Sequence, residues 1–275
     1  MFRLFPLMPR GTSPAMSSDE IFSRAARRVR RHHVARAAAA DRWLLDRMWQ
    51  ELAARAADAL PAPHSVLLVG EDFGALAGAP ILSAPQLMRA EPGWRPGWPN
   101  PALACDEDRI DTQGVRFDLI LACGTLDSLH DVPGALILMR RLLNPGGRFF
   151  GAMLGAGSLS TLRHIAYGAD SAQVARLHPQ IDVRAAGDLL ARAGFAEPVA
   201  DMEIVPARFG TWQRYVRDLR ANGIGNCLTQ RYTLPRATLT QWMNRFDGLR
   251  DEDGRVTEEF CPVYLSGASP IPSQA

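Results

Sequence analysis

Short apolar runs alternate with helical segments through the middle of this chain. VLLVG at residues 66–70 and FDLILAC at residues 117–123 are typical of buried strands. RFFGAML at residues 148–154 is a further expected strand, and the residues 133–143 before it have the apolar spacing of a helix. Hairpin signals are missing between these segments. The order predicts an α/β fold, with a mostly parallel sheet and helices on both faces.

Weaker apolar segments complete the expected sheet. Residues 81–83 and 102–105 are candidates for its second and third strands, and residues 200–209 and 260–267 for later ones. The Pro- and Trp-rich stretch EPGWRPGWPNP at residues 91–101 is predicted to be a loop. The second and third strands are therefore expected on either side of this loop.

Composition divides the chain into a main domain, a helical extension and two ends. Residues 1–17 are predicted to be disordered or to reflect a misassigned start, with Met16 as the true one, although a short organelle-targeting segment would have the same composition. The other divisions are a helical extension at residues 18–60, a main domain at 61–267 with helical insertions at about 158–192 and 211–245, and a tail at 268–275.

Charge and cysteine content exclude several classes of protein. The 31 basic and 29 acidic residues leave a net charge of +2, which gives no electrostatic case for nucleic acid. All the basic residues are Arg, so a P-loop and Lys-based Schiff-base chemistry are excluded. The four cysteines form no CxxC pair, which argues against a disulfide framework or a structural zinc site. A reducing cytoplasm is the expected compartment.

A Gly-containing turn, Gly70-Glu71-Asp72-Phe73-Gly74, directly follows the first expected strand. In open α/β sheets, ligands bind beyond the C-terminal ends of the strands, where glycine lets the backbone approach them. Glu71 and Asp72 would place negative charge at the N-terminus of the next helix. Taken alone, the segment is more typical of a tight structural turn than of a ligand site.

Taken together, these segments resemble class I S-adenosylmethionine-dependent methyltransferases, which have a Rossmann-like fold. Their LxPGG signature stands here as Leu143-Asn144-Pro145-Gly146-Gly147, where Pro and Gly end a helix before the next strand. GSLSTLRHI, RAAGDLLARAGFAEPVAD and DLRANGIGN further resemble the methyltransferase-like assembly factors of respiratory complex I and their alphaproteobacterial relatives. This branch lies near the malonyl-carrier-protein methyltransferases of biotin synthesis. The resemblance covers roughly residues 20–267.

The resemblance implies S-adenosylmethionine as cofactor. The positions it assigns to the cofactor are Gly70, Asp72, Gly74, Ser83, Asp106, Cys123 and Gly124. Three positions depart from the family pattern: Leu68 replaces an acid, Asp72 replaces a glycine, and Ser83 replaces the acid that holds the ribose hydroxyls. Loss of about 3 kcal/mol of such hydrogen bonds would weaken a micromolar site about a hundredfold. Cofactor binding is therefore left open.

Two functions are compatible with these residues. The first is a methyltransferase, or a methyltransferase-derived modifier, acting on a protein or a carrier-bound acid, and we favour it narrowly because of the resemblance. The second is an inactive methyltransferase-like assembly or binding protein, for example in complex I biogenesis, which the altered turn favours. Methyl transfer to a carboxylate depends mainly on positioning, so no catalytic residue is assigned. One family member is associated with arginine hydroxylation, but the sequence offers no two-His-one-carboxylate metal set.

Arginine-rich helices provide the candidates for contacts with substrate and partner. On the expected helix at residues 211–223 and just after it, the substrate candidates are Tyr215, Arg217, Asp218, Arg220 and Asn226. Arg presents a planar fork that suits carboxylate or phosphate, although a solvated face or an internal Arg–Asp pair is the alternative. The basic stretch from Arg24 to Arg36 could contact an anionic membrane or an acidic protein partner, or could be a solvated face.

Overall fold

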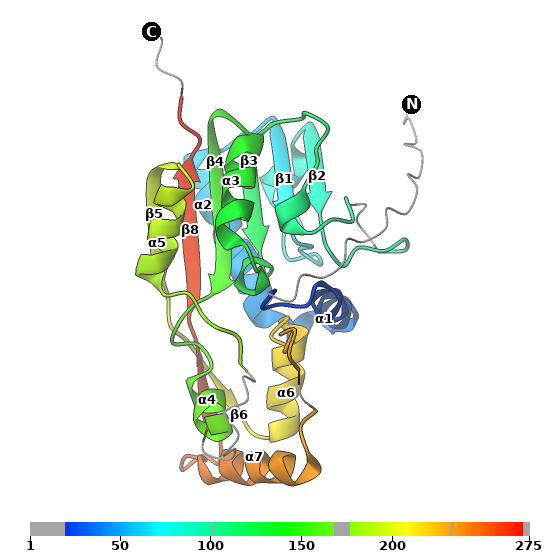
Figure 1. Ribbon diagram of the computed structural model, residues 1–275, viewed down its shortest axis with the longest axis vertical. Helices are drawn as coiled ribbons and strands as arrows, with labels where there is room; N and C mark the ends of the chain where they lie inside the picture. The colour runs from blue at the N-terminus through cyan, green and yellow to red at the C-terminus, as the bar shows by residue number, and fades with distance from the viewer. Residues whose placement is uncertain (1–19, 99, 101, 168–176, 232, 272–275) are drawn as a thin grey trace.

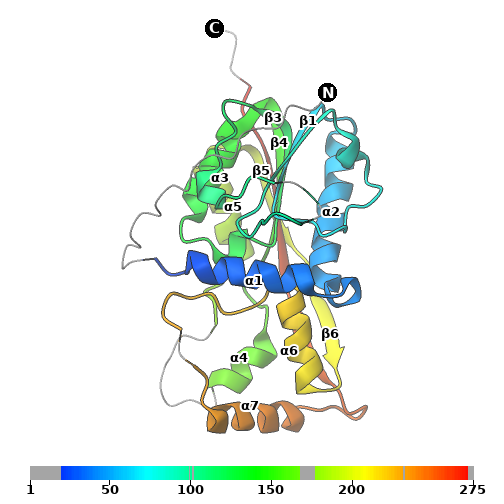
Figure 2. The same cartoon turned by 90° about the vertical axis from the view of Figure 1, so that its right-hand side faces the viewer.

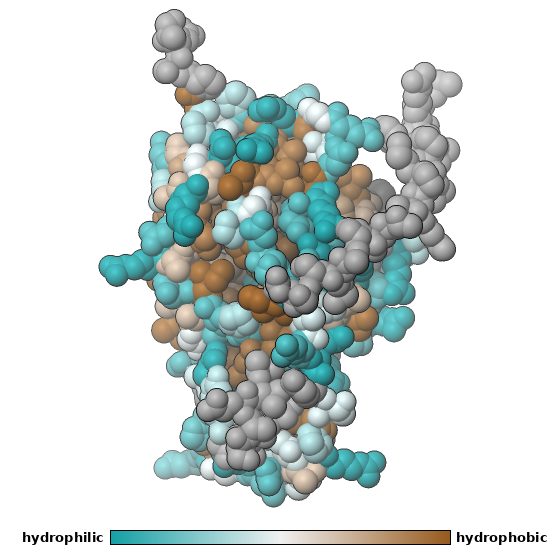
Figure 3. All heavy atoms as spheres, viewed as in Figure 1, coloured by the Kyte–Doolittle hydropathy of each residue, from teal (hydrophilic) through white to brown (hydrophobic). Residues whose placement is uncertain are grey.

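The computed structural model describes residues 20–98, 100, 102–167, 177–231 and 233–271. Residues 1–17, where a late start was predicted, lie outside this part, as do residues 168–176 of the first predicted insertion and 272–275 of the predicted tail. An upper unit contains the main sheet and a narrower lower unit consists mostly of helices (Figure 1). In the same view, hydrophobic residues gather over the middle of the upper unit, and hydrophilic ones follow the outline (Figure 3).

The main sheet has six strands within the described residues, in the order β2-β1-β3-β4-β8-β5. These are β1 (Ser65–Val69), β2 (Gln86–Ala90), β3 (Phe117–Cys123), β4 (Leu143–Leu154), β5 (Ala196–Met202) and β8 (Pro262–Ala268). The first four in this order are parallel to one another. Strand β8 lies antiparallel between β4 and β5. The predicted α/β fold with a mostly parallel sheet is therefore confirmed.

Helices cover both faces of the main sheet (Figure 2). Helix α2 (Trp43–Ala59) places Trp49 and Leu52 against the face that contains Leu68. Helices α3 (Val132–Leu142) and α5 (Val183–Arg192) pack Leu136 and Leu190 on the opposite face. Strands β1 and β3 are consequently buried on both sides, which explains why they are continuous apolar runs in the sequence.

Two predicted strands were wrong. Residues 81–83 belong to a 3-10 helix, η2 (Pro80–Ser83), and the second strand is β2, a few residues later. Residues 102–105 form only a single bridge, from Leu103 to Ala90. Strand β2 lies at the sheet edge and is only half-buried, so it needs no apolar run and has no strong signal in the sequence.

The lower unit contains a small sheet and three helices among the described residues. Its sheet pairs β6 (Val205–Phe209) with β7 (Val256–Phe260) in antiparallel fashion. Helices α4 (Ser160–Tyr167), α6 (Trp212–Ala221) and α7 (Arg236–Gly248) enclose an aromatic core with it. The segments predicted as single strands, 200–209 and 260–267, each contribute to both sheets, so β7 and β8 join the two units almost without interruption.

Helix α1 (Arg24–Arg36) crosses the lower edge of the main sheet, between the two units (Figure 2). Its N-cap is Ser23, whose side chain accepts a hydrogen bond from the Ala26 amide. The helix thus lies at the C-terminal ends of the parallel strands, where ligands of α/β proteins bind. No helix among the described residues is long and apolar enough to cross a membrane.

Candidate functional site

The turn after β1 is tight but does not lead into a helix. Gly70 has a φ of +99°, and a Cβ at this position would lie 2.4 Å from the Cys123 carbonyl oxygen, so glycine is required. The described residues 71–79 that follow form successive turns. The helix N-terminus predicted at Glu71 and Asp72 is therefore wrong, and the turn lacks the helix dipole that Rossmann-type sites use for anions.

The two acids of this turn are buried and have partners within the protein. Asp72 accepts a hydrogen bond from the Leu76 amide and forms an ion pair with Arg89 at 3.2 Å. Glu71 accepts a hydrogen bond of 2.6 Å from Asn100, and burial raises the pKa of its carboxyl group. Both side chains therefore stabilise the turn itself. Gly74, in contrast, faces open space.

Glu91 is the acid that follows the second strand. It is fully buried, and its carboxylate accepts hydrogen bonds of 2.8 Å from the backbone amides of Glu71 and Gly93. The assignment of this position to Ser83 was wrong because the second strand had been placed too early; Ser83 is exposed in η2. A signal was present in the sequence, since Glu91 opens the loop at residues 91–101.

Arg31 of α1 reaches from the helix into the space between the strand ends. Its side chain is fully buried, and Nη2 lies 2.8 Å from Glu91 Oε2. Nη1 donates to the Gly124 carbonyl at 3.3 Å, and Nη2 donates to the Glu71 carbonyl at 3.4 Å. Burial opposes its charge, but pairing with Glu91 raises the pKa of Arg31 above its usual value. One side chain therefore connects the segments that follow β1, β2 and β3.

Four other arginines of α1 form ion pairs with acids near the same edge of the sheet. The pairs are Arg24–Asp108 at 2.6 Å, Arg27–Glu107 at 2.8 Å, Arg28–Asp106 at 3.0 Å and Arg30–Asp127 at 3.4 Å. The carboxylate of the predicted site residue Asp106 is thus already paired with an arginine of α1. Contact of this basic stretch with a membrane stays a prediction, with fewer free charges to support it.

The predicted residues at the end of β3 also meet α1. A methyl group added at Gly124 would lie 2.7 Å from Leu45 Cδ1 and 3.3 Å from Arg31 Nη1, so these side chains already fill the space beside Gly124. Cys123 is buried, and burial raises the pKa of its thiol, which therefore stays protonated. The structure brings Gly70, Asp106, Cys123 and Gly124 together under α1.

The substrate candidates on and after α6 separate into three groups. Tyr215 donates a hydrogen bond of 2.6 Å to buried Glu258, and Asp218 pairs with Arg214 at 2.8 Å, so both have internal partners. Arg217 and Arg220 are exposed and line a groove of about 610 Å³. Asn226 lines a different cavity. The predicted set therefore does not form one site.

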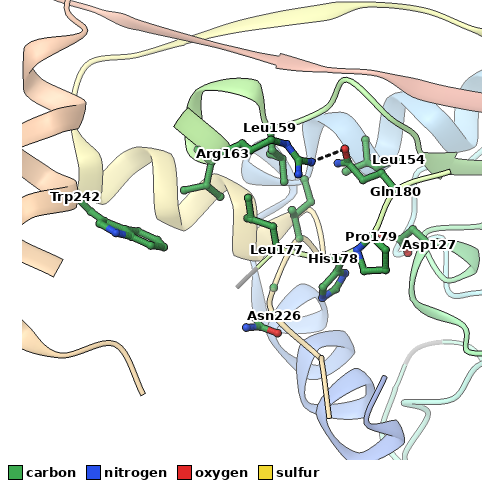
Figure 4. Close-up of a pocket in the computed structure, with 13 residues that line it drawn as sticks. Asp127, Leu154, Leu159, Arg163, Leu177, His178, Pro179, Gln180, Asn226 and Trp242 are labelled. Atoms are coloured by element: carbon green, nitrogen blue, oxygen red, sulfur yellow. Dashed lines mark hydrogen bonds between the residues drawn. The ribbon is translucent and has the colours of Figure 1, made fainter. Parts of the chain in front are cut away.

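The cavity that Asn226 lines lies between the two units and has a volume of about 200 Å³ (Figure 4). Its wall is partly apolar, with Leu159, Leu177 and Trp242, and partly polar, with Arg163 and Gln180 joined by a hydrogen bond of 2.8 Å. In the described part of the chain, no group of three His, Cys, Asp or Glu side chains is placed to hold a metal ion. The cavity could hold a small amphipathic group.

His178 in this cavity wall is expected to make stability depend on pH. Its Nε2 accepts a hydrogen bond of 2.9 Å from the Cys227 amide. Burial, with a contribution from Arg30, lowers its pKa from 6.5 to about 4. The unfolded chain therefore binds this proton as pH falls below 6.5, whereas the native chain does not, so stability is lost on acidification. We expect a loss of about 2 kcal/mol between about pH 7 and pH 5 from this residue.

Urea unfolding at several pH values tests this expectation. The matched variant is His178→Gln, because Gln can still accept the Cys227 hydrogen bond but does not titrate. Its stability should fall less steeply over the same pH interval. Equal slopes for the two proteins would contradict the assignment.

The curated proteins that match the chain include two kinds. Arginine-hydroxylase NDUFAF5 of Danio rerio is 31% identical over 183 residues, which are 64% of this chain and 57% of that protein. Malonyl-[acyl-carrier protein] O-methyltransferase of Laribacter hongkongensis is 30% identical over 167 residues, 60% of this chain and 55% of that protein. The chain thus spans little more than half the length of the curated relatives it matches. No protein-family model matches it.

These matches, together with the topology of the main sheet, establish the fold. The chain has the class I methyltransferase fold. It is a distant homologue of both kinds of protein, as the resemblance implied. Among solved structures, YcgJ from Bacillus subtilis aligns over 81% of this chain and 100% of its own, with 10% identity and a TM-score of 0.49. A Burkholderia thailandensis 1,6-didemethyltoxoflavin-N1-methyltransferase, solved with S-adenosylhomocysteine, aligns over 94% and 93%, with 17% identity and a TM-score of 0.48.

The residues under α1 do not fit S-adenosylmethionine while the helix lies in this position. Glu91 is the acid that the methyltransferase fold would offer to the ribose hydroxyls, and it already accepts hydrogen bonds from Arg31, Glu71 and Gly93. Arg31 and Leu45 fill the space beside Gly124. In this position Arg31 therefore holds the carboxylate that a cofactor's ribose would need.

Proposed function

We propose that the chain is a methyltransferase-fold protein that binds a protein partner and does not transfer methyl groups. One observation supports this proposal: Arg31 is paired with buried Glu91, the acid after the second strand, where the resemblance expects the ribose hydroxyls of a cofactor. Breaking a buried ion pair by removing one partner costs about 3–5 kcal/mol. A ligand that displaced Arg31 would lose at least a hundredfold in affinity, unless it supplied a new cation to Glu91.

A second candidate is methyl transfer after α1 has moved away. The observation that favours it is the presence of Glu91 and Asp106, two acids at positions that the resemblance assigns to the ribose and the adenine edge. In that case Arg31 would release Glu91 when cofactor binds. The acceptor would then be a protein or a carrier-bound acid.

Calorimetric titration of the full chain with S-adenosylmethionine distinguishes the two candidates. We expect no binding by the wild-type protein up to about 1 mM ligand, because Arg31 already holds Glu91. The matched control is Arg47→Gln, which removes a half-exposed arginine paired with Glu203, away from α1. A micromolar dissociation constant for the wild-type protein would sink the proposal and support methyl transfer. Binding of S-adenosylmethionine by Arg31→Gln but not by the wild-type protein would support the proposal that the Arg31 side chain blocks the cofactor.

A further inference from the structure

A basic groove separate from the cofactor position lies between the end of α1 and the outer face of α6. It has a volume of about 610 Å³. Arg36, the last residue of α1, and Arg217 and Arg220 of α6 line it together with Trp212 and Val216. Because Arg217 and Arg220 are three residues apart on one helix, their side chains lie on the same face. Two elements distant in sequence thus bring three arginines to one concave surface.

These three arginines lack the internal partners that the five other arginines of α1 have. Within the described part of the chain, the guanidinium groups of Arg36, Arg217 and Arg220 take part in no hydrogen bond or ion pair, and all three residues are exposed. The acid on the groove, Asp41, is neutralised by Arg214 at 2.9 Å. The surface is therefore positive and its donors are free for an external ligand.

The shape and chemistry of the groove favour a carboxylate-rich protein segment. Each guanidinium group offers a planar fork that matches a carboxylate. Half-buried Trp212 and Val216 add apolar surface beside these forks, which suits a segment that carries both acidic and apolar side chains. A flat membrane surface does not follow a concave groove, and a net charge of +2 gives no support for nucleic acid.

We propose that the groove formed by Arg36, Arg217, Arg220, Trp212 and Val216 binds an acidic segment of a partner protein. The inference rests on the proposed function in one respect, because it supplies the partner that a binding protein requires. It does not depend on whether the cofactor binds, since the groove and the position of Arg31 use different residues.

Fluorescence anisotropy with a short labelled peptide of alternating Glu and Leu tests the proposal. We expect the full wild-type chain to bind it at low salt, and R217Q/R220Q to bind about tenfold more weakly, since exposed charge pairs are modest individually. The matched control R184Q/R192Q removes the same charge from exposed positions on α5, on the other side of the molecule (Figure 1). It should change the affinity less than twofold. Thermal melting verifies that both variants are folded.

Several outcomes would overturn the proposal. These are no binding of the Glu-Leu peptide, equal binding of a Gln-Leu peptide, and equal losses in the two double variants. Phosphatidylserine vesicles that bind the wild-type protein more tightly than the peptide does, and bind R217Q/R220Q more weakly, would assign the groove to a membrane instead.

The S-adenosylmethionine titration separates the proposed function from the proposed groove. Peptide binding together with cofactor binding leaves the groove assigned and removes the proposed function, whereas loss of both kinds of binding removes only the groove.

Discussion

Replacing Arg31 by Met is expected to lower the free energy of unfolding by about 3–5 kcal/mol. The substitution keeps most of the side-chain volume but leaves the Glu91 carboxylate buried, with only the Glu71 and Gly93 amides as donors. It also removes the donor to the Gly124 carbonyl. Urea unfolding near neutral pH measures the effect. A loss below about 1 kcal/mol would contradict the described position of this side chain.

A double substitution tests whether the cost arises from the unpaired charge. Glu91→Gln removes the charge and keeps an amide oxygen for the backbone donors, so Arg31→Met with Glu91→Gln should be more stable than Arg31→Met alone. Arg47→Met is the control for loss of a partly exposed ion pair, with Glu203 as partner, and should cost less than about 1 kcal/mol. A double variant no more stable than the single one would assign the loss to packing.

Replacing Glu258 by Leu is expected to cost about 3 kcal/mol or more. Glu258 of β7 is fully buried and accepts hydrogen bonds from the Tyr215 hydroxyl at 2.6 Å and from the amides of Thr161 and Leu162 at 3.0 and 2.9 Å. The two amides belong to the first turn of α4, so this carboxylate of β7 caps the N-terminus of that helix. Leu would leave all three donors buried without an acceptor. Urea unfolding gives the total loss, and hydrogen exchange should show that the α4 amides lose protection first.

The isosteric variant Glu258→Gln separates capping from burial. Its amide oxygen can still accept hydrogen bonds, so it should lose clearly less stability than Glu258→Leu. Tyr215→Phe, which removes the hydroxyl donor and leaves the cap of α4 in place, should cost about 1 kcal/mol. Similar losses for the Leu and Gln variants would contradict the capping role.

The strands that the sequence predicts well are those buried on both faces. Strands β1 and β3 are continuous apolar runs because helices cover them on either side. Strand β2 could not be located in this way because it is half-buried at an edge. Because the strand was predicted a few residues too early, the residue expected to hold the ribose hydroxyls was taken to be Ser83 instead of Glu91. An error of a few residues in one edge strand thus changed a predicted site residue.

The role of α1 could not be predicted from local patterns. Its Arg-rich sequence is compatible with a solvated face, a membrane or a partner, and only the tertiary fold places Arg31 beside Glu91, 60 residues away in the chain. The same limit applies to α6, where spacing alone does not tell that Tyr215 is internal while Arg217 and Arg220 remain exposed. Ion pairs between distant segments follow from topology, which residue spacing does not encode.

The position of β8 constrains the order in which this chain can fold during synthesis. This strand, at residues 262–268, is the last of the described strands, yet it lies inside the main sheet and pairs with both β4 and β5. Until it has left the ribosome, β4 and β5 have no partner on their facing edges. The nascent chain must therefore keep the facing edge of β4 unpaired from residue 154 onward and that of β5 from residue 202 onward, until β8 has been made. This is the situation in which chaperone binding prevents aggregation.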